Sequence, residues 1–88
     1  MEFKKSANKI YLENESGNEV ARVEFLSYNI NEITITHTFV DKSLQGQGIA
    51  KKLLDEVCLY AEENKLTIIP ECSYAVNYFE KLALKKNN

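Results

Sequence analysis

The residue types best suited to chemistry form a short glycine-rich turn, Gln45-Gly46-Gln47-Gly48-Ile49-Ala50. The turn follows a run that alternates like a strand and precedes a run with helical periodicity. The first backbone N–H groups of a helix have no partner within it, and the helix dipole is positive at that end. Two glycines let the main chain approach an anion closely, and the small Ala50 leaves the first helical turn uncrowded. We therefore expect this turn to bind an anion such as a phosphate.

Charged residues at both ends of the predicted helix support this interpretation. Lys51-Lys52 lie in its first turn and Glu62-Glu63 in its last turn, so both pairs oppose the helix dipole. An anion bound at the helix N-terminus would attract Lys51-Lys52 and so reverse their unfavourable interaction with the helix dipole. Local rules of this kind tend to be broken at functional sites. The alternative is that these four exposed charges are only solvated.

Two common phosphate-binding motifs do not fit this turn. A P-loop requires Gly-x-x-x-x-Gly-Lys-Ser/Thr, whereas this chain has Gly48-Ile49-Ala50-Lys51-Lys52, with no hydroxyl for a magnesium ion. A dinucleotide-binding turn requires Gly-x-Gly-x-x-Gly, and its third glycine is replaced here by Lys51.

The periodicity of the sequence predicts an α+β fold in the order strand, strand, strand, helix, strand, helix. Short turns allow the first three strands to pair as an antiparallel meander. The helix between the third and fourth strands is a crossover, which requires those two strands to be parallel in a mixed four-stranded sheet. Ser73 is the expected cap of the last helix. The predicted strands are 10–13, 19–26, 32–40 and 66–69. One predicted helix starts from Gly48 and is ended by Asn64-Lys65, and the other runs from Ser73 to about Ala83.

Composition narrows the class of protein. The 88 residues are enough for one domain, which we place at 1–88 with 85–88 as a frayed tail. A net charge of −2 and a single arginine, Arg22, argue against a nucleic-acid partner. No run approaches the roughly 18 apolar residues of a membrane span, and the N-terminus lacks the apolar core of a signal peptide, so we expect a cytoplasmic protein with no membrane partner. One histidine and two cysteines are too few for a metal site.

The segment from Val40 to Leu54 resembles motif A of the GNAT acetyltransferases, whose core is Arg/Gln-x-x-Gly-x-Gly/Ala. Gln45, Gly48 and Ala50 match that core. The run His37-Thr38-Phe39-Val40 before the turn, and Cys72 after the fourth strand, are similar to the short GNAT-related, YjdJ-like group. The resemblance covers about residues 32–84 and implies a minimal GNAT-like fold.

The resemblance implies an acetyl-CoA-dependent N-acetyltransferase, with acetyl-CoA or CoA as co-substrate and an unidentified amine as acceptor. The pantetheine arm would bind the backbone of Phe39 and Val40, where the strand carrying residues 36–40 splays from the strand carrying 66–70. The thioester would then lie near 70–73. The pyrophosphate would be bound by Gln45, Gly46, Gln47, Gly48, Ile49 and Ala50, with Lys51 beside them.

One departure from the family concerns catalysis. In the last family motif a tyrosine often serves as general acid to the leaving thiolate, but Phe79 stands at its position here and Tyr78 is one residue away, about 100° around the helix. Cys72 stands where the family has asparagine. A thiol near a helix N-terminus ionises more readily, so Cys72 is the candidate that accepts the acetyl group or deprotonates the amine. The alternative is that Cys72 only packs.

Other side chains leave two readings open. Alternation places His37 on one face with Ile33, Ile35 and Phe39, either as a core residue or as a base near the thioester. Cys58 is expected to pack in the core, and Tyr74 and Tyr78 either line the mouth of the pocket or pack. The alternative function is a non-catalytic CoA-binding or protein-interaction module, and either kind of protein is expected to be a monomer or a weak homodimer.

Overall fold

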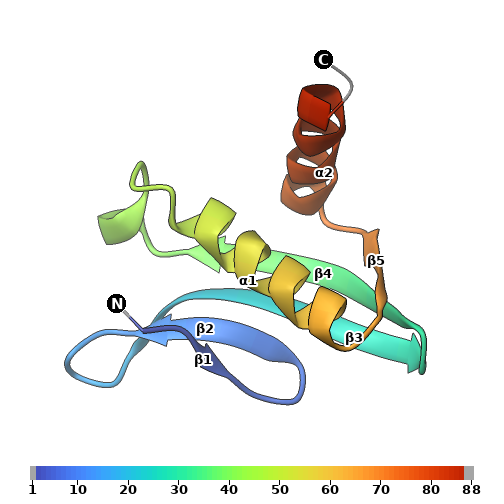
Figure 1. Ribbon diagram of the computed structural model, residues 1–88. Helices are drawn as coiled ribbons and strands as arrows, with labels where there is room; N and C mark the ends of the chain where they lie inside the picture. The colour runs from blue at the N-terminus through green and yellow to red at the C-terminus, as the bar shows by residue number, and fades with distance from the viewer. Residues whose placement is uncertain (1, 87–88) are drawn as a thin grey trace.

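The computed structural model describes residues 2–86 and has the predicted α+β architecture (Figure 1). The strands form one sheet in the order β1-β2-β3-β4-β5. The sheet has five strands instead of the predicted four, because two residues at the N-terminus pair with Tyr11 and Ile10, an edge too short to show alternation. The elements are β1 (Lys4–Lys5), β2 (Lys9–Glu13), β3 (Glu19–Asn29), β4 (Glu32–Val40), the 3-10 turn η1 (Lys42–Leu44), α1 (Ile49–Glu63), β5 (Thr67–Pro70) and α2 (Ser73–Lys86).

The sheet combines an antiparallel meander with one parallel pair, as predicted. β1 to β4 are antiparallel neighbours, and β5 returns parallel to β4 after the α1 crossover. The parallel pairing runs only from Glu32 opposite Thr67 to Ile35 opposite Pro70. Beyond Ile35, β4 continues to Val40 without β5 beside it. The two strands therefore separate at this point.

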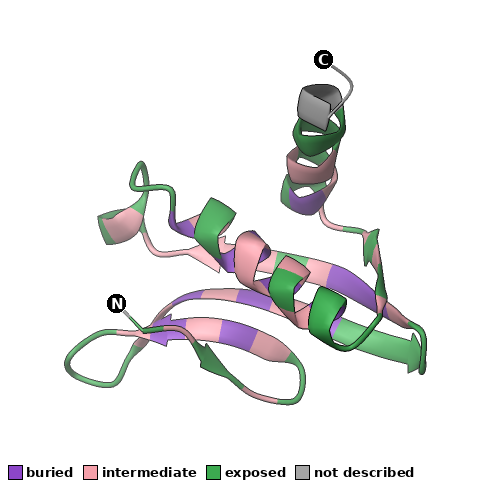
Figure 2. Ribbon diagram, in the orientation of Figure 1, coloured by how far each residue is buried: buried purple, intermediate pink, exposed green. Residues whose placement is uncertain are grey.

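Both helices pack on one face of the sheet. α1 contacts β2, β3 and β4, whereas α2 contacts β4, β5 and α1. No helix in residues 2–86 is long and apolar enough to span a membrane. Figure 2 shows the buried residues concentrated beneath α1. The core side chains are Ile10, Leu12, Ala21, Val23, Phe25, Ile33, Ile35, Ile49, Leu53, Leu54, Val57, Ala61 and Ala75.

A bulge in β4 reverses the faces that the alternation predicts. Glu24 pairs with His37 and Phe25 pairs with Ile35, so Thr36 is an extra residue without a partner on β3. His37 is consequently exposed on the opposite face from Ile35, and its predicted place on the apolar face is wrong. Thr38, paired with the buried Val23, takes the face covered by the helices.

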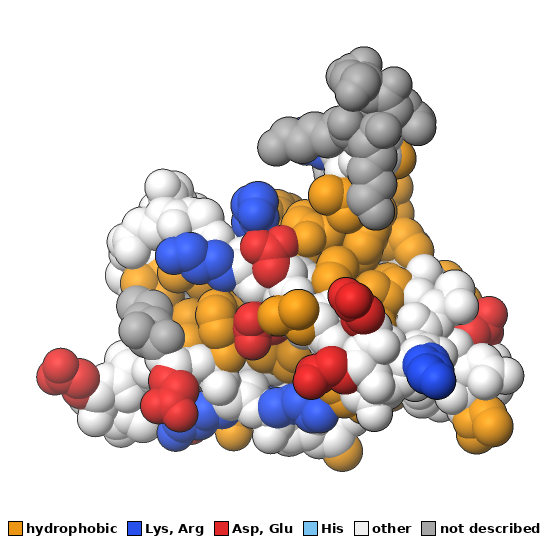
Figure 3. All heavy atoms as spheres, viewed as in Figure 1, with side chains coloured by type: hydrophobic (Ala, Val, Ile, Leu, Met, Phe, Trp, Pro, Cys, Tyr) orange, Lys and Arg blue, Asp and Glu red, His pale blue; other side chains and the backbone are white. Residues whose placement is uncertain are grey.

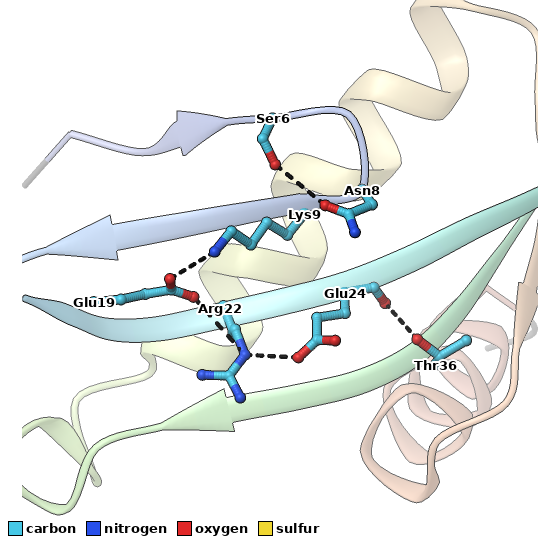
Figure 4. Close-up of polar contacts among 7 residues, drawn as sticks. All are labelled: Ser6, Asn8, Lys9, Glu19, Arg22, Glu24 and Thr36. Atoms are coloured by element: carbon cyan, nitrogen blue, oxygen red, sulfur yellow. Dashed lines mark hydrogen bonds and ion pairs between the residues drawn. The ribbon is translucent and has the colours of Figure 1, made fainter.

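The face opposite the helices carries a charged ladder (Figure 4). Lys9 pairs with Glu19 at 2.7 Å, and the Nε of Arg22 lies 2.6 Å from the Oε2 of Glu24. The Arg22 guanidinium also lies 4.8 Å from the ring centre of Phe39. The side chain of Phe39 therefore faces away from α1.

Both helices end close to their predicted limits. α1 ends at Glu63, directly before the predicted stop at Asn64-Lys65. α2 continues past Ala83 to Lys86, because no glycine or proline interrupts it. Residues 85 and 86 therefore lie within α2, and residues 87 and 88 lie outside the described part of the chain. The frayed tail at 85–88 stays a prediction.

Candidate functional site

The loop between β4 and α1 is fixed by side-chain contacts to its own backbone. The carboxylate of Asp41 accepts hydrogen bonds from the N–H and the hydroxyl of Ser43, at 3.0 and 2.6 Å, and so caps η1. The N–H of Asp41 donates to the carbonyl of Val20 at 2.8 Å, which anchors the loop to β3. The amide of Gln45 donates back to the carbonyl of Val40 at 3.3 Å. The glycine turn thus starts from a defined position at the end of β4.

The two glycines of the turn adopt backbone angles that few other residues tolerate. The φ angles of Gly46 and Gly48 are 84° and 74°, both left-handed, and a Cβ atom at either position would meet no atom within 4 Å. Gly48 is the N-cap of α1 and supplies no side-chain acceptor. Within residues 2–86, none of the backbone N–H groups of 46–51 donates to a protein acceptor. These six donors are available to an anion.

A cavity of about 330 Å³ opens beside these donors. Its wall comes from β4, from the glycine turn, from the start of α1 and from one residue of α2. It contains Thr38, Val40, Leu44, Gln45, Gly46, Gly48, Ile49, Ala50 and Tyr74.

Most of the predicted binding residues line this cavity, and three do not. The side chain of Phe39 lies on the opposite face of the sheet, while Gln47 and Lys51 line neighbouring cavities. Thr38 and Leu44 are wall residues that the sequence did not indicate. Alternation alone places Thr38 on the face of the sheet that Ile35 does not share. Only the bulge at Thr36 brings Thr38 to the face of the cavity.

Cys72 caps α2 in place of the predicted Ser73. Its carbonyl accepts the N–H of Val76 at 3.0 Å, and its Sγ accepts the N–H of Ala75 at 3.4 Å. The Sγ also lies 3.4 Å from the hydroxyl of Thr38. Cys72 is half-buried and is not part of the cavity wall, so Thr38 stands between the thiol and the cavity.

His37 lies apart from Cys72 and from the cavity. It pairs with Glu24 on the exposed face of the sheet. The hydrogen bond from Arg22 lowers the pKa of Glu24 below its ordinary value and outweighs burial, which acts to raise it. The structure therefore does not bring the two predicted catalytic residues together.

Tyr78 joins the two helices instead of facing the cavity. Its hydroxyl donates to Oδ1 of Asp55 at 2.5 Å, and Lys51 holds Oδ2 of the same carboxylate at 3.0 Å. Burial and the bond to Asp55 raise the pKa of Tyr78 well above its usual value. Burial also acts to raise the pKa of Asp55, but the hydrogen bonds from Tyr78 and Lys51 and the charge of Lys51 outweigh it and leave that pKa lowered. The neutral tyrosine and the ionised aspartate stabilise each other.

We expect Tyr78→Phe to lower the free energy of unfolding by roughly 1 kcal/mol at neutral pH, because it removes a half-exposed hydrogen bond to a charged group. In the unfolded chain Tyr78 ionises near pH 10, at about the ordinary tyrosine pKa, whereas the folded chain keeps the proton. The contribution is therefore complete below about pH 10 and is lost as the pH rises further.

Urea unfolding of both proteins from about pH 7 to about pH 10.5 measures this difference. Tyr28→Phe is the matched control, since Tyr28 is 72% exposed and its loss should change stability by less than about 0.5 kcal/mol. A difference between native and Tyr78→Phe proteins that stays constant with pH would contradict the assignment.

Known proteins share both the sequence pattern and the fold. The family model described as GCN5-related N-acetyl-transferase matches residues 9–85. A GCN5-like candidate N-acetyltransferase from Staphylococcus aureus is 42% identical, with a TM-score of 0.75 over 91% of this chain and 78% of its own. No curated protein has a sequence that matches the chain significantly.

Larger acetyltransferases have the same fold with less similar sequences. One from Bacillus cereus is 25% identical, with a TM-score of 0.68 over 85% of this chain and 54% of its own. A GNAT family acetyltransferase from Elizabethkingia anophelis, with acetyl-CoA bound, is 16% identical, with a TM-score of 0.65 over 85% of this chain and 51% of its own. The chain thus spans about half of these two proteins. Together with the family match over residues 9–85, the fold shows that this chain belongs to the GCN5-related N-acetyltransferase family.

Proposed function

We propose that the chain binds acetyl-CoA in the cavity beside β4 and transfers the acetyl group to an amine. The observation that carries the proposal is the row of backbone N–H groups at 46–51, which have no protein acceptor in the described chain. Four of these residues, Gly46, Gly48, Ile49 and Ala50, line that cavity. Membership of an acetyltransferase family supports it. A protein of the same fold from Elizabethkingia anophelis holds acetyl-CoA.

The glycine turn would bind the pyrophosphate. Hydrogen bonds from neutral donors to a charged acceptor are stronger than those between neutral groups, and the positive end of the α1 dipole adds to them. The left-handed angles at Gly46 and Gly48 allow successive N–H groups to face one anion. This arrangement requires no metal ion and no basic side chain in the cavity wall.

The free edge of β4 would bind the pantetheine arm. Past Ile35, β4 has no β5 neighbour, so its backbone groups on that edge can pair with the amides of the arm as they would with another strand. Val40 and Thr38 line the cavity along this edge. An arm that runs from the turn toward the gap between β4 and β5 would bring the thioester close to Thr38 and Cys72.

Acyl transfer requires the amine nitrogen to attack the thioester carbonyl carbon, after which the carbon–sulfur bond breaks and the thiolate takes a proton. Phe79 has no proton to give, and the hydroxyl of Tyr78 keeps its proton and donates its hydrogen bond to Asp55. Cys72 is the remaining candidate, because the N–H of Ala75 and the hydroxyl of Thr38 lie 3.4 Å from its sulfur. It would either attack the thioester carbonyl carbon itself, with its proton passing to the CoA thiolate, and then transfer the acetyl group to the amine, or accept the proton of the attacking amine and give it to the CoA thiolate. His37, on the opposite face, has no role in this proposal.

A non-catalytic CoA-binding module is the second candidate. It is favoured by the position of Thr38 between the cavity and Cys72, and by the engagement of Tyr78 with Asp55. Binding without turnover would separate it from an enzyme.

Binding is tested with glycine substitutions. CoA should raise the melting temperature of the native protein by mass action. Gly48→Ala should weaken CoA binding by at least about tenfold. The methyl group of the alanine has room in the protein but would occupy space beside the pyrophosphate. An alanine with φ at 74° also strains the turn by about 1 kcal/mol.

Gly17→Ala is the matched control for this strain. Gly17 has a φ of 84° in the turn between β2 and β3, and a methyl group there would likewise meet no atom within 4 Å. Both variants should lose similar stability, but only Gly48→Ala should lose affinity in calorimetric titration. The proposal fails if the native protein gives neither heat nor a melting shift with millimolar CoA.

Catalysis is tested at Cys72, with acetyl-CoA as donor and a panel of small primary amines. We expect CoA release in the native protein and in Cys58→Ser. In Cys72→Ala the rate of CoA release should fall by at least about tenfold, because the variant lacks the thiol that acts as nucleophile or as general base. Cys72→Ser retains an N-cap and so separates loss of chemistry from loss of the helix cap.

Intact mass after incubation with acetyl-CoA distinguishes the two roles of Cys72. One added acetyl group that is absent in Cys72→Ala indicates a nucleophile, whereas transfer without an acetylated protein indicates a base. A native rate in Cys72→Ala would exclude both roles. CoA binding without release of CoA from acetyl-CoA in the presence of any of the amines would identify a binding module.

A further inference from the structure

Thr38 connects the cavity beside the glycine turn to the thiol of Cys72. Its half-buried side chain lines that cavity, whereas Cys72 is not part of the wall. The Oγ1 of Thr38 lies 3.4 Å from the Sγ of Cys72, and either atom can donate that hydrogen bond. A hydroxyl has one donor and two acceptor sites, so it can bond the sulfur and a group in the cavity at the same time. Thr38 is therefore placed to pass a proton between the two.

Cys72 is held so firmly that its sulfur is poorly placed to enter the cavity. Its N–H donates to the carbonyl of Ile35 at 3.2 Å, and its carbonyl accepts the N–H of Val76 at 3.0 Å. The sulfur accepts the N–H of Ala75 at 3.4 Å and so caps α2. To attack a thioester in the cavity, the sulfur would have to leave this cap and displace Thr38 from the wall. The geometry suits a thiol that exchanges protons through Thr38 better than one that attacks carbon.

The rest of the wall offers few groups that exchange protons. None of the described residues that line the cavity has a carboxylate, imidazole or amine side chain. Figure 3 shows hydrophobic side chains gathered on the face between α1 and α2, the two helices that contribute to the wall. Thr38 and Tyr74 supply the hydroxyls of the wall. Of these two, within residues 2–86, only the Thr38 hydroxyl has a hydrogen bond to an ionisable side chain.

We propose that Thr38 relays protons between Cys72 and the reacting atoms in the cavity. The inference rests on the proposed acetyl transfer, and it decides between the two roles left open for Cys72. The thiol acts as a base through Thr38 and does not attack the thioester. The position of Thr38 between the sulfur and the cavity would hinder a nucleophile, but it is the position that a relay requires.

The proposed reaction begins with Cys72 as a thiolate. As the amine nitrogen bonds to the thioester carbonyl carbon, it gives a proton to the Oγ1 of Thr38, whose own hydrogen passes to the sulfur of Cys72. The carbon–sulfur bond of the thioester then breaks, and both of its electrons go to the CoA sulfur. Cys72 returns the proton through Thr38 to that sulfur, so CoA leaves as a thiol and Cys72 is again a thiolate. Proton transfer of this kind contributes roughly 10²- to 10⁴-fold to a rate.

The experiment measures acetyl transfer from acetyl-CoA to the most reactive amine of the panel, in the native protein and in variants of Thr38. Thr38→Val keeps a β-branched side chain on the strand and removes the hydroxyl. It should lower kcat by at least about tenfold, because the relay is lost. The KM for acetyl-CoA should stay within about twofold, because the hydroxyl acts in the transition state. Thr38→Ser restores the hydroxyl and should keep kcat within about threefold of the native value.

Thr38→Ala distinguishes a relay from a barrier. It removes the hydroxyl and also opens the wall between Cys72 and the cavity. For a relay, this variant should be about as slow as Thr38→Val, and its intact mass should show no acetyl group after incubation with acetyl-CoA. If Thr38 only blocks a nucleophile, the alanine variant should match or exceed the native rate and carry an acetyl group on Cys72. That result would overturn the inference.

Thr34→Val is the matched control for the loss of a threonine hydroxyl on β4. Thr34 is 4% exposed and does not line the cavity. Its substitution should leave kcat unchanged. Urea unfolding checks that both valine variants are folded under the assay conditions. If Thr38→Val does not fold, the comparison of Thr38→Ala with Thr38→Ser tests the same loss of the hydroxyl.

The inference and the proposed function fail in different ways. A native kcat in Thr38→Val overturns the inference and leaves the proposed function intact. An acetyl group that forms on Cys72 of the native protein and passes to the amine has the same consequence. If the native protein releases no CoA from acetyl-CoA with any amine, the proposed acetyl transfer and the inference both fail.

Discussion

The carbonyl oxygen of Ile35 accepts two backbone hydrogen bonds, from the N–H groups of Glu71 at 3.0 Å and Cys72 at 3.2 Å. Within the described residues, these are the last backbone hydrogen bonds between β4 and the chain that leaves β5. Past it, β4 continues alone, and the chain from Cys72 onward turns into α2. The free edge of β4, the cap at Cys72 and the placement of Tyr74 against the cavity beside the glycine turn all depend on where this separation occurs.

The bulge at Thr36 lies next to the same point and determines which side chains face the helices. By adding one residue to β4, it exchanges His37 for Thr38 on the inner face. Thr38 then reaches Cys72 and the cavity wall, while His37 joins the charged face with Glu24. At the far end of β4, beside the left-handed glycines, the N–H groups of 46–51 have no protein acceptor among residues 2–86. The candidate site is thus a strand edge with a thiol at one end and, at the other, the turn that we propose to bind the pyrophosphate.

The sequence predicts the parts of this arrangement that depend on local chemistry. Alternation, helical periodicity and the glycines at 46 and 48 give the order of elements, the parallel β4–β5 pair and the turn. It does not predict the positions of His37 and Thr38, because the bulge results from pairing between β3 and β4 and has no local signal. The sequence places the cap of α2 one residue too late, at Ser73, because serine is a usual N-cap residue. In the structure the thiol of Cys72 is the cap. The bond from Tyr78 to Asp55 joins residues 23 apart in the chain, which only the packing of α2 on α1 brings together.

Backbone amide NMR tests the central claim most directly, because it observes the N–H groups at 46–51 one by one. With saturating CoA, the amide signals of Gly46, Gly48 and Ala50 should show the largest shifts, and that of Gly17, with similar backbone geometry in another turn, should not move. Unchanged signals at residues 46–51, with the largest shifts instead on the charged face around Arg22 and Glu24, would contradict the account.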